Sequence, residues 1–300
     1  MVLVFVARDY LTWYSRTVVH RTLISSDLLE ANLTNQKWIV IDCRFDLSDT
    51  TSGEQSYKEH HIPGAVYAHL DRDLSGTPTG RNGRHPLPAI AVMEDTFGKF
   101  GINHETQVVA YDESNGIFAS RLWWMLRYLG HDAVAVLDGG ITKWNQEAKP
   151  LQKSSEGRTR TVFTANPHPD MLVGASQVQV LLNESTHRIL DARSPDRYAG
   201  GTEPLDSVAG HIPGAMNHHY GNNVTEEGSF IEPAKLRLIY NQLLQDIQPS
   251  RLVCYCGSGV TACHNLLAME HAGLSGAKLY AGSWSEWCSD PERPVARKQK

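Results

Sequence analysis

Long apolar runs and an excess of basic charge are both missing from this sequence of 300 residues. No segment approaches the roughly 20 consecutive apolar residues that a membrane-spanning helix needs. The chain carries 28 lysines and arginines against 33 aspartates and glutamates, a formal net charge of -5. Binding to nucleic acid depends on a concentrated positive field, which this balance does not supply. Neither a membrane nor a nucleic acid is therefore expected as a partner.

Cysteine is also scarce. The five cysteines are an odd number and few for the length of the chain, which argues against a disulfide framework. Free thiols persist in reducing compartments, so we expect a cytoplasmic protein. The five are Cys43, Cys254, Cys256, Cys263 and Cys288.

The chain repeats itself. Its length suits two domains of about 150 residues better than one. Four short motifs of the first half recur in the same order and at nearly the same offset in the second half, which indicates a tandem duplication of one domain. The matched segments are Asp42–Arg44 with Asp191–Arg193, His61–Ala65 with His211–Ala215, Val108–Asp112 with Leu252–Cys256, and Asp138–Gly140 with Ala281–Ser283.

The repeat sets the expected domain boundaries. We predict an N-terminal extension over residues 1–19, a first domain over 20–147 and a second over 169–296. The stretch between them, 148–168, is polar and shows no apolar period, so it is interpreted as the linker.

Each copy alternates short β-branched runs with helical patterns, and the runs are apolar on both faces. That pattern favours an α/β domain with an open, mostly parallel sheet flanked by helices. Strands are expected at 38–42, 108–111, 133–137, 189–191, 252–255 and 277–280, and helices at 117–129, 176–183, 233–244 and 260–271.

Ligands of such sheets bind beyond the carboxyl ends of the strands, and Cys256 stands at that edge of the second copy. It is followed by Gly257-Ser258-Gly259-Val260-Thr261 and then by a predicted helix. The free N–H groups and partial positive charge of a helix N-terminus favour a thiolate, and the two glycines let successive amides turn inward around an anion. A buried cysteine before a flexible turn is the plainer alternative, but the position at a strand end favours a catalytic thiol.

Two other uses of this loop are disfavoured. A phosphatase loop of the Cys-x5-Arg type would need an arginine at position 262, which is alanine, to hold a phosphate. A zinc site would draw on Cys254, Cys256 and the pair Cys263-His264, but these lack the Cys-x2-Cys spacing, so no metal is expected.

The first copy has Asp112 where the second has Cys256. Without a thiol it cannot carry a group as a cysteine does, so we expect it to be non-catalytic.

Taken together, these residues resemble the rhodanese superfamily, in its tandem-domain sulfurtransferase form, over about residues 20–290. The paired motifs resemble the family's domain signature, and aspartate in place of cysteine in the first domain is also its pattern. The segment Tyr280–Trp287 is similar to the family's C-terminal signature, with Ala281 where aspartate is usual. The loop Cys256–Thr261 is similar to that of 3-mercaptopyruvate sulfurtransferases, whereas thiosulfate-preferring members tend to carry basic residues at 257 and 258.

The resemblance implies a sulfurtransferase that moves a sulfane sulfur from 3-mercaptopyruvate, or thiosulfate, through a persulfide on Cys256. The acceptor would be a thiol, a dithiol such as thioredoxin, or cyanide. Because the cysteine itself carries the sulfur, no metal and no organic cofactor is implied. The cleft would lie between two domains of one chain, so we expect a monomer.

The resemblance also implies roles for individual residues. Arg197 matches the arginine that the family places against the anionic group of the substrate, and Asp71 and His85 match a pair proposed to work with the loop serine, Ser258. A second arginine that many mercaptopyruvate enzymes have is missing from the stretch 202–210, which leaves the donor open. The loop residues expected to hold the outer sulfur are Gly257, Gly259, Val260 and Thr261.

Three alternatives remain at this point. The enzyme could prefer thiosulfate, the chain could be a non-catalytic rhodanese-like binding module, or it could pass sulfur to a protein partner in a relay.

Overall fold

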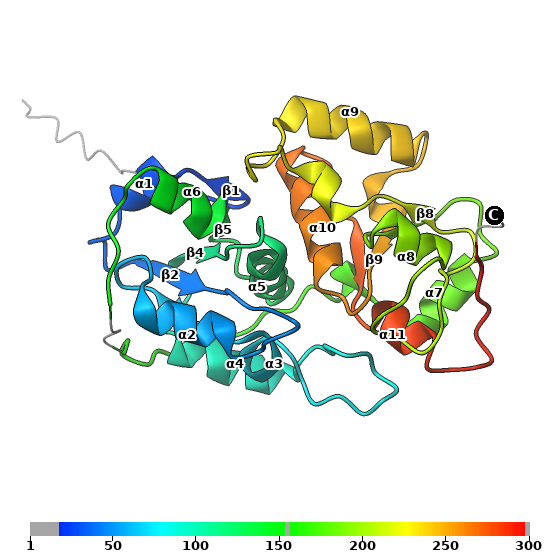
Figure 1. Cartoon of the computed structure of the whole chain (residues 1–300), viewed down its shortest axis with the longest axis horizontal. Coiled ribbons are helices and arrows are strands. Elements are labelled where there is room, and N and C mark those ends of the chain that lie inside the picture. The colour runs from blue at the N-terminus through cyan, green and yellow to red at the C-terminus, as the bar shows by residue number, and fades with distance from the viewer. Residues whose placement is uncertain (1–17, 154–156, 298–300) are drawn as a thin grey trace, which may run out of the picture.

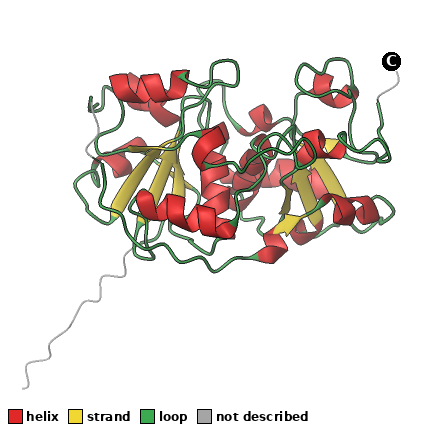
Figure 2. Cartoon of the chain, turned by 90° about the horizontal axis from the view of Figure 1, so that it is seen from below, coloured by secondary structure: helices red, strands yellow, loops and turns green. Residues whose placement is uncertain are grey.

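The computed structural model describes residues 18–153 and 157–297. It has two α/β domains side by side, each built on one five-stranded sheet (Figures 1 and 2). The predicted extension over 1–19 lies almost entirely outside the described residues. None of the helices in the described ranges is long and apolar enough to cross a bilayer.

Both sheets are parallel throughout, as predicted, and have the same strand order. The first sheet runs β1-β5-β4-β2-β3 and the second β6-β10-β9-β7-β8. This identity of topology confirms that the repeated motifs mark a duplicated domain. The strands are β1 Leu23–Ile24, β2 Trp38–Asp42, β3 Val66–Tyr67, β4 Gln107–Tyr111 and β5 Val134–Leu137, then β6 Leu172–Val173, β7 Arg188–Asp191, β8 Met216–Asn217, β9 Leu252–Tyr255 and β10 Lys278–Tyr280.

The helices agree with the sequence in the long segments and add several short ones. The four predicted helices correspond to α5, α7, α9 and α10, with ends shifted by one or two residues. The bounds are α1 Ser26–Glu30, α2 Ser52–Glu59, α3 Leu70–Asp73, α4 Ile90–Lys99, α5 Ile117–Tyr128, α6 Gly140–Gln146, α7 Ala175–Leu181, α8 Pro195–Ala199, α9 Pro233–Leu244, α10 Thr261–His271 and α11 Ser283–Trp287, with 3-10 turns at η1 Pro169–Met171, η2 Tyr220–Asn223 and η3 Pro249–Arg251.

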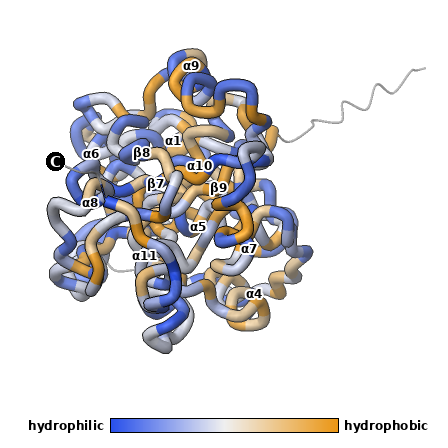
Figure 3. The backbone as a smooth tube through the Cα atoms, turned by 90° about the vertical axis from the view of Figure 1, so that its right-hand side faces the viewer, coloured by the Kyte–Doolittle hydropathy of each residue, from blue (hydrophilic) through white to orange (hydrophobic). Residues whose placement is uncertain are grey.

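One apolar core runs through both domains. Residues of α5 and α10 belong to the same buried cluster as the inner faces of both sheets, so these two helices form the centre of the domain interface (Figure 1). Apolar colouring along β9 and α10 marks this region in Figure 3. The outer face of each sheet has a smaller cluster of its own. The relative position of the two domains is therefore fixed by hydrophobic burial.

The segment predicted as the linker packs closely on the first domain. The backbone N–H of Thr161 donates to Gly98, and that of Asn166 donates to Leu129. Phe163 is only 6% exposed and belongs to the shared core. The polar composition of 148–168 had not indicated this packing, because it depends on a single aromatic side chain.

A buried ion pair closes the end of one inner strand in each domain, β2 in the first and β7 in the second. Asp42, at the end of β2, accepts hydrogen bonds from Arg44 Nε and Nη2, and Tyr111 donates its hydroxyl to the same carboxylate at 2.6 Å. Arg44 also donates to the carbonyl of His60 at 2.7 Å, which ties the strand to the loop before the His-Ile-Pro-Gly-Ala turn. Asp191 and Arg193 repeat the ion pair in the second domain.

We expect Asp42→Asn to lower the free energy of unfolding by about 3 kcal/mol, because it leaves the buried Arg44 guanidinium without its counter-ion. Urea denaturation measures the change, and Asp170→Asn, at an exposed acid, is the control. A loss no larger than that of the control would show that the pair does not hold the strand end.

Candidate active site

Cys256 lies directly after β9, at the carboxyl end of the strand and in front of α10, as predicted. It is 2% exposed, and its Sγ accepts the backbone N–H of Gly259 at 3.1 Å. Gly259 has a φ of +77°, and a Cβ there would lie 2.2 Å from the carbonyl oxygen of Ala281. Only glycine therefore fits at this turn of the loop.

The matching loop of the first domain holds an anion. The Asp112 carboxylate accepts four backbone N–H groups, at 2.7 to 2.9 Å, from residues of its own loop and the start of α5. A loop of this shape, in front of a helix, thus converges its amides on a buried negative charge. The four donors are Ser114, Gly116, Phe118 and Ala119.

The structure brings together the three residues that were predicted to work as a group. Ser258 Oγ lies 2.7 Å from His85 Nδ1, and His85 Nε2 lies 3.2 Å from Asp71 Oδ1. Burial lowers the pKa of His85 to about 3, and the charges of Arg121 and Arg84 act in the same direction. The ring is therefore neutral near pH 7. With its Nε2–H facing Asp71, its Nδ1 accepts the hydroxyl hydrogen of Ser258.

A cavity of about 270 Å³ opens at this place, and both domains line it. Gly257, Ser258, Val260 and Thr261 contribute to the wall, whereas Gly259 is turned beneath Cys256 and does not. A larger hollow of about 510 Å³ in the first domain is lined by Gly64 and Ala65 of the repeated turn, but by no residue of the cysteine loop and by none of the predicted site residues, so we place the chemistry at the smaller cavity. The other lining residues are Leu47, Leu70, Arg84, His85, Ile117, Phe118, Arg193, Ser194, Arg197, Leu205, His219, Tyr220 and Cys256.

Two arginines, one from each domain, approach the loop. A Cβ placed on Gly257 would lie 2.8 Å from Arg84 Nη2 and 3.4 Å from Arg197 Nη1 and Nη2. Arg197 was predicted, and Arg84 was not, because an arginine between Gly83 and His85 also suits a solvated turn. Its position directly before His85 was the signal that could have found it. The second cation that the stretch 202–210 lacks is thus present, but it comes from the first domain.

Arg121, on α5, is a further cation that the sequence had not indicated. It is fully buried and donates from Nη1 to the carbonyl of Gly259 at 3.1 Å and from Nη2 to the carbonyl of His85 at 3.0 Å. Nη2 also lies 3.3 Å from the carbonyl oxygen of Leu74. One side chain thus ties the cysteine loop of the second domain to the histidine of the first.

The neighbouring thiols differ from Cys256 in their environment. Burial raises the pKa of Cys263 to about 12 and raises the pKa of Cys254 as well, so both stay protonated near pH 7. Cys263 Sγ donates to the carbonyl of Gly259 at 3.3 Å. Across residues 18–153 and 157–297, no three His, Cys, Asp or Glu side chains gather in a way that could hold a metal ion.

Comparison with known proteins shows which family has these features. A family model for the rhodanese-like domain matches residues 25–147 and 174–290. A Pseudomonas aeruginosa protein named "Probable 3-mercaptopyruvate sulfurtransferase" is 43% identical over 276 residues, covering 91% of this chain and 97% of that protein. The thiosulfate sulfurtransferase of Rattus norvegicus is 33% identical over 292 residues, covering 93% and 97%. The structure of 3-mercaptopyruvate sulfurtransferase from Leishmania major superposes with a TM-score of 0.78 at 28% identity, covering 89% of this chain and 74% of that one.

The fold, the cysteine loop and these relatives define an enzyme of sulfur transfer, a sulfurtransferase. The chain belongs to the rhodanese family and contains two rhodanese-like domains.

We expect Arg121→Met to lower both the melting temperature and kcat/KM, each clearly more than a surface change does. Its loss leaves the buried carbonyls of His85 and Leu74 without their donor, at about 1 kcal/mol or more each, and frees the cysteine loop from His85. Arg127→Met is the control on the same helix, since Arg127 is partly exposed and pairs with Asp132 rather than with the cysteine loop. Thermal melts and steady-state assays of both variants make the comparison, and equal behaviour would contradict the positioning role of Arg121.

Proposed function

We propose that this sulfurtransferase takes its sulfur from 3-mercaptopyruvate and carries it on Cys256. The observation that supports this donor is the row of Ser258, His85 and Asp71 beside the thiol. Release of pyruvate requires a proton to move, whereas release of sulfite from thiosulfate does not. A serine joined to a neutral, buried histidine is suited to moving that proton.

In the first half-reaction, the Cys256 thiolate attacks the sulfur of 3-mercaptopyruvate. A sulfur–sulfur bond forms, the carbon–sulfur bond breaks, and its electron pair stays on carbon as the enolate of pyruvate. The proton of the donor's thiol passes through Ser258 to Nδ1 of His85 and returns by the same way to the enolate carbon. Asp71 stabilises the imidazolium while it exists.

The carboxylate of the sulfur donor and the outer sulfur of the persulfide each have hydrogen-bond donors nearby. The carboxylate of the donor meets Arg84 and Arg197, which flank Gly257. The outer sulfur of the persulfide meets the amides of the loop from Gly257 to Thr261, in the way that the first domain holds Asp112.

In the second half-reaction, an acceptor thiolate attacks the outer sulfur, the sulfur–sulfur bond breaks, and the Cys256 thiolate leaves. Cyanide would give thiocyanate, and a dithiol protein such as thioredoxin would give its disulfide and hydrosulfide. Leu47 and Leu205, at the cavity, are 54% and 46% exposed and offer apolar contact to a protein acceptor. Since the thiolate is the carrier, the scheme requires neither a metal nor an organic cofactor.

We also propose that the protein acts as a monomer, because one chain supplies both sides of the cavity. It also includes a reducing, cytoplasmic setting, because the five cysteines are free and four of them are buried.

Thiosulfate is the second candidate donor. It is favoured by the two arginines at the cavity, which suit a sulfonate as well as a carboxylate, and it would use the same persulfide without Ser258.

Sulfur transfer from each donor to cyanide, on the wild type and on Cys256→Ser, tests the proposal. We expect mercaptopyruvate to exceed thiosulfate by about tenfold or more in kcat/KM, a difference of about 1.4 kcal/mol, and Cys256→Ser to be inactive with both. A preference for thiosulfate would overturn the donor, and activity of Cys256→Ser would overturn the mechanism. Cys288→Ser, at a partly exposed cysteine, is the matched control.

A second variant separates the proton relay from the thiol. We expect His85→Ala to lower kcat with mercaptopyruvate by about 100-fold, the usual range for loss of acid–base catalysis, and to change thiosulfate turnover by less than about threefold. Parallel assays on His104→Ala, at an exposed histidine of the same domain, provide the reference. Equal losses with both donors would mean that His85 only supports the loop.

A further inference from the structure

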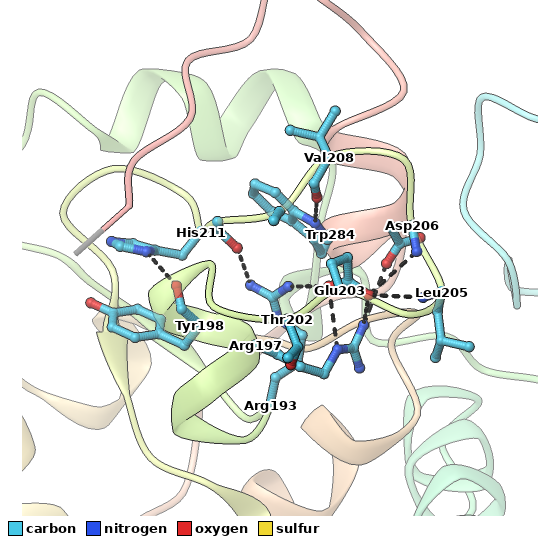
Figure 4. A network of polar contacts seen from close by, with 12 residues as sticks. Arg193, Arg197, Tyr198, Thr202, Glu203, Leu205, Asp206, Val208, His211 and Trp284 are labelled. Atoms are coloured by element: carbon cyan, nitrogen blue, oxygen red, sulfur yellow. Dashed lines mark hydrogen bonds and ion pairs between the residues drawn. The ribbon is translucent and has the colours of Figure 1, made fainter. Parts of the chain in front are cut away.

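The segment after α8 folds two acidic side chains back onto the arginines of the cavity (Figure 4). Glu203 is 3% exposed and accepts Arg197 Nη2 at 2.6 Å and Arg193 Nη1 at 3.1 Å. Burial acts to raise the pKa of Glu203, but Arg197, the backbone N–H of Leu205 and Arg193 together outweigh burial and hold the pKa below its usual value. Glu203 also accepts the backbone N–H groups of Leu205 and Asp206 at 3.2 and 3.3 Å, so its carboxylate fixes the course of the loop.

Unlike Glu203, Asp206 forms ion pairs with arginines of both domains. Its Oδ1 accepts Arg84 Nη1 of the first domain in a very close ion pair, and its Oδ2 lies 3.5 Å from Arg197 Nη2 of the second. The side chain is 5% exposed, and Oδ2 accepts no hydrogen bond within residues 18–153 and 157–297. A carboxylate with one buried oxygen that accepts no hydrogen bond in the described residues therefore contacts both cations that face Gly257, and Figure 4 shows its side toward Arg197.

The charges at this end of the cavity are consequently balanced before a donor arrives. Arg193 faces Asp191, Arg197 faces Glu203, and Arg84 faces Asp206. An incoming anion gains from both cavity arginines but is repelled by Asp206, and this repulsion grows in proportion to the charge of the anion. Near pH 7 mercaptopyruvate carries one negative charge and thiosulfate carries two, so the cost of the Asp206 carboxylate is about twice as large for thiosulfate.

We propose that Asp206 is a donor-discriminating residue, whose carboxylate between Arg84 and Arg197 selects monoanionic sulfur donors over dianionic ones. This inference rests on the proposed function, since it concerns the same cavity and the same two donors. Positions 257 and 258 carry no basic residue to offset the repulsion. Asp206 acts on selectivity through charge, and the loop geometry depends on Glu203.

The test compares kcat/KM for 3-mercaptopyruvate and for thiosulfate, with cyanide as acceptor at low salt, in the wild type and in Asp206→Asn. At effective dielectric constants near a protein surface, removing one charge changes the interaction by about tenfold per unit of donor charge. The ratio of thiosulfate to mercaptopyruvate activity should therefore rise by about tenfold in Asp206→Asn. Because the Asp206 side chain is only 5% exposed, salt screens it weakly, so the charge-conserving variant rather than added salt separates a charge effect from a structural one.

Two further variants define the outcome. Asp206→Glu keeps the charge and should keep the wild-type ratio, and Asp246→Asn removes an exposed charge remote from the cavity and should leave the ratio unchanged. If Asp206→Asn does not fold, as judged by its melting curve, Asp206→Ser is the second neutral variant. A rise of less than threefold in a folded neutral variant, or an equal rise in Asp206→Glu, overturns the inference while the proposed function stands. Absence of transfer from either donor in the wild type would remove both.

Discussion

The active site of this protein depends on the packing of α5 in the first domain against α10 in the second. The two helices begin at corresponding loops, and their first residues line one cavity. Their contact buries one continuous core and brings Ser258 to within 2.7 Å of His85. Arg121 adds direction to this apolar contact, because its hydrogen bonds reach the cysteine loop and the carbonyl of His85 at once. Apolar burial has no preferred direction, so by itself it would let the two helices shift along each other. The hydrogen bonds of the buried Arg121 guanidinium group are directional, so they fix the position of the contact.

Duplication gave two loops of the same shape, which differ in what fills them. In the first loop Asp112 supplies its own anion and saturates four amides permanently. In the second loop the sulfur atom of Cys256 takes this place, and it accepts the amide of Gly259 at 3.1 Å. The first domain is thereby a rigid support whose remaining side chains, His85 and Arg84, project toward the partner domain.

Much of the fold and the heart of the site could be predicted from the sequence. The repeated motifs located both domains, and the long apolar runs located the inner strands. The edge strands β1, β3, β6 and β8 could not be found, because each has two residues and so shows no period. Cys256, Ser258 and Arg197 were predicted from the loop and the family resemblance, and the structure places all three at one cavity. Arg84 and Arg121 were missed because their partners, Asp206 and Gly259, lie more than a hundred residues further along the chain. Nothing local in the sequence distinguishes such an arginine from one on a solvated surface.

The division of the site between two domains has a consequence for how such a protein can change over generations. His85 and Ser258 are encoded in different copies of the repeat, so neither copy can be lost, exchanged or separated without ending their contact. The domain without the cysteine is therefore not redundant, because it supplies His85 to this contact. Because α5 and α10 share one buried core, a change of volume on the contact face of one helix has to be accommodated by the other.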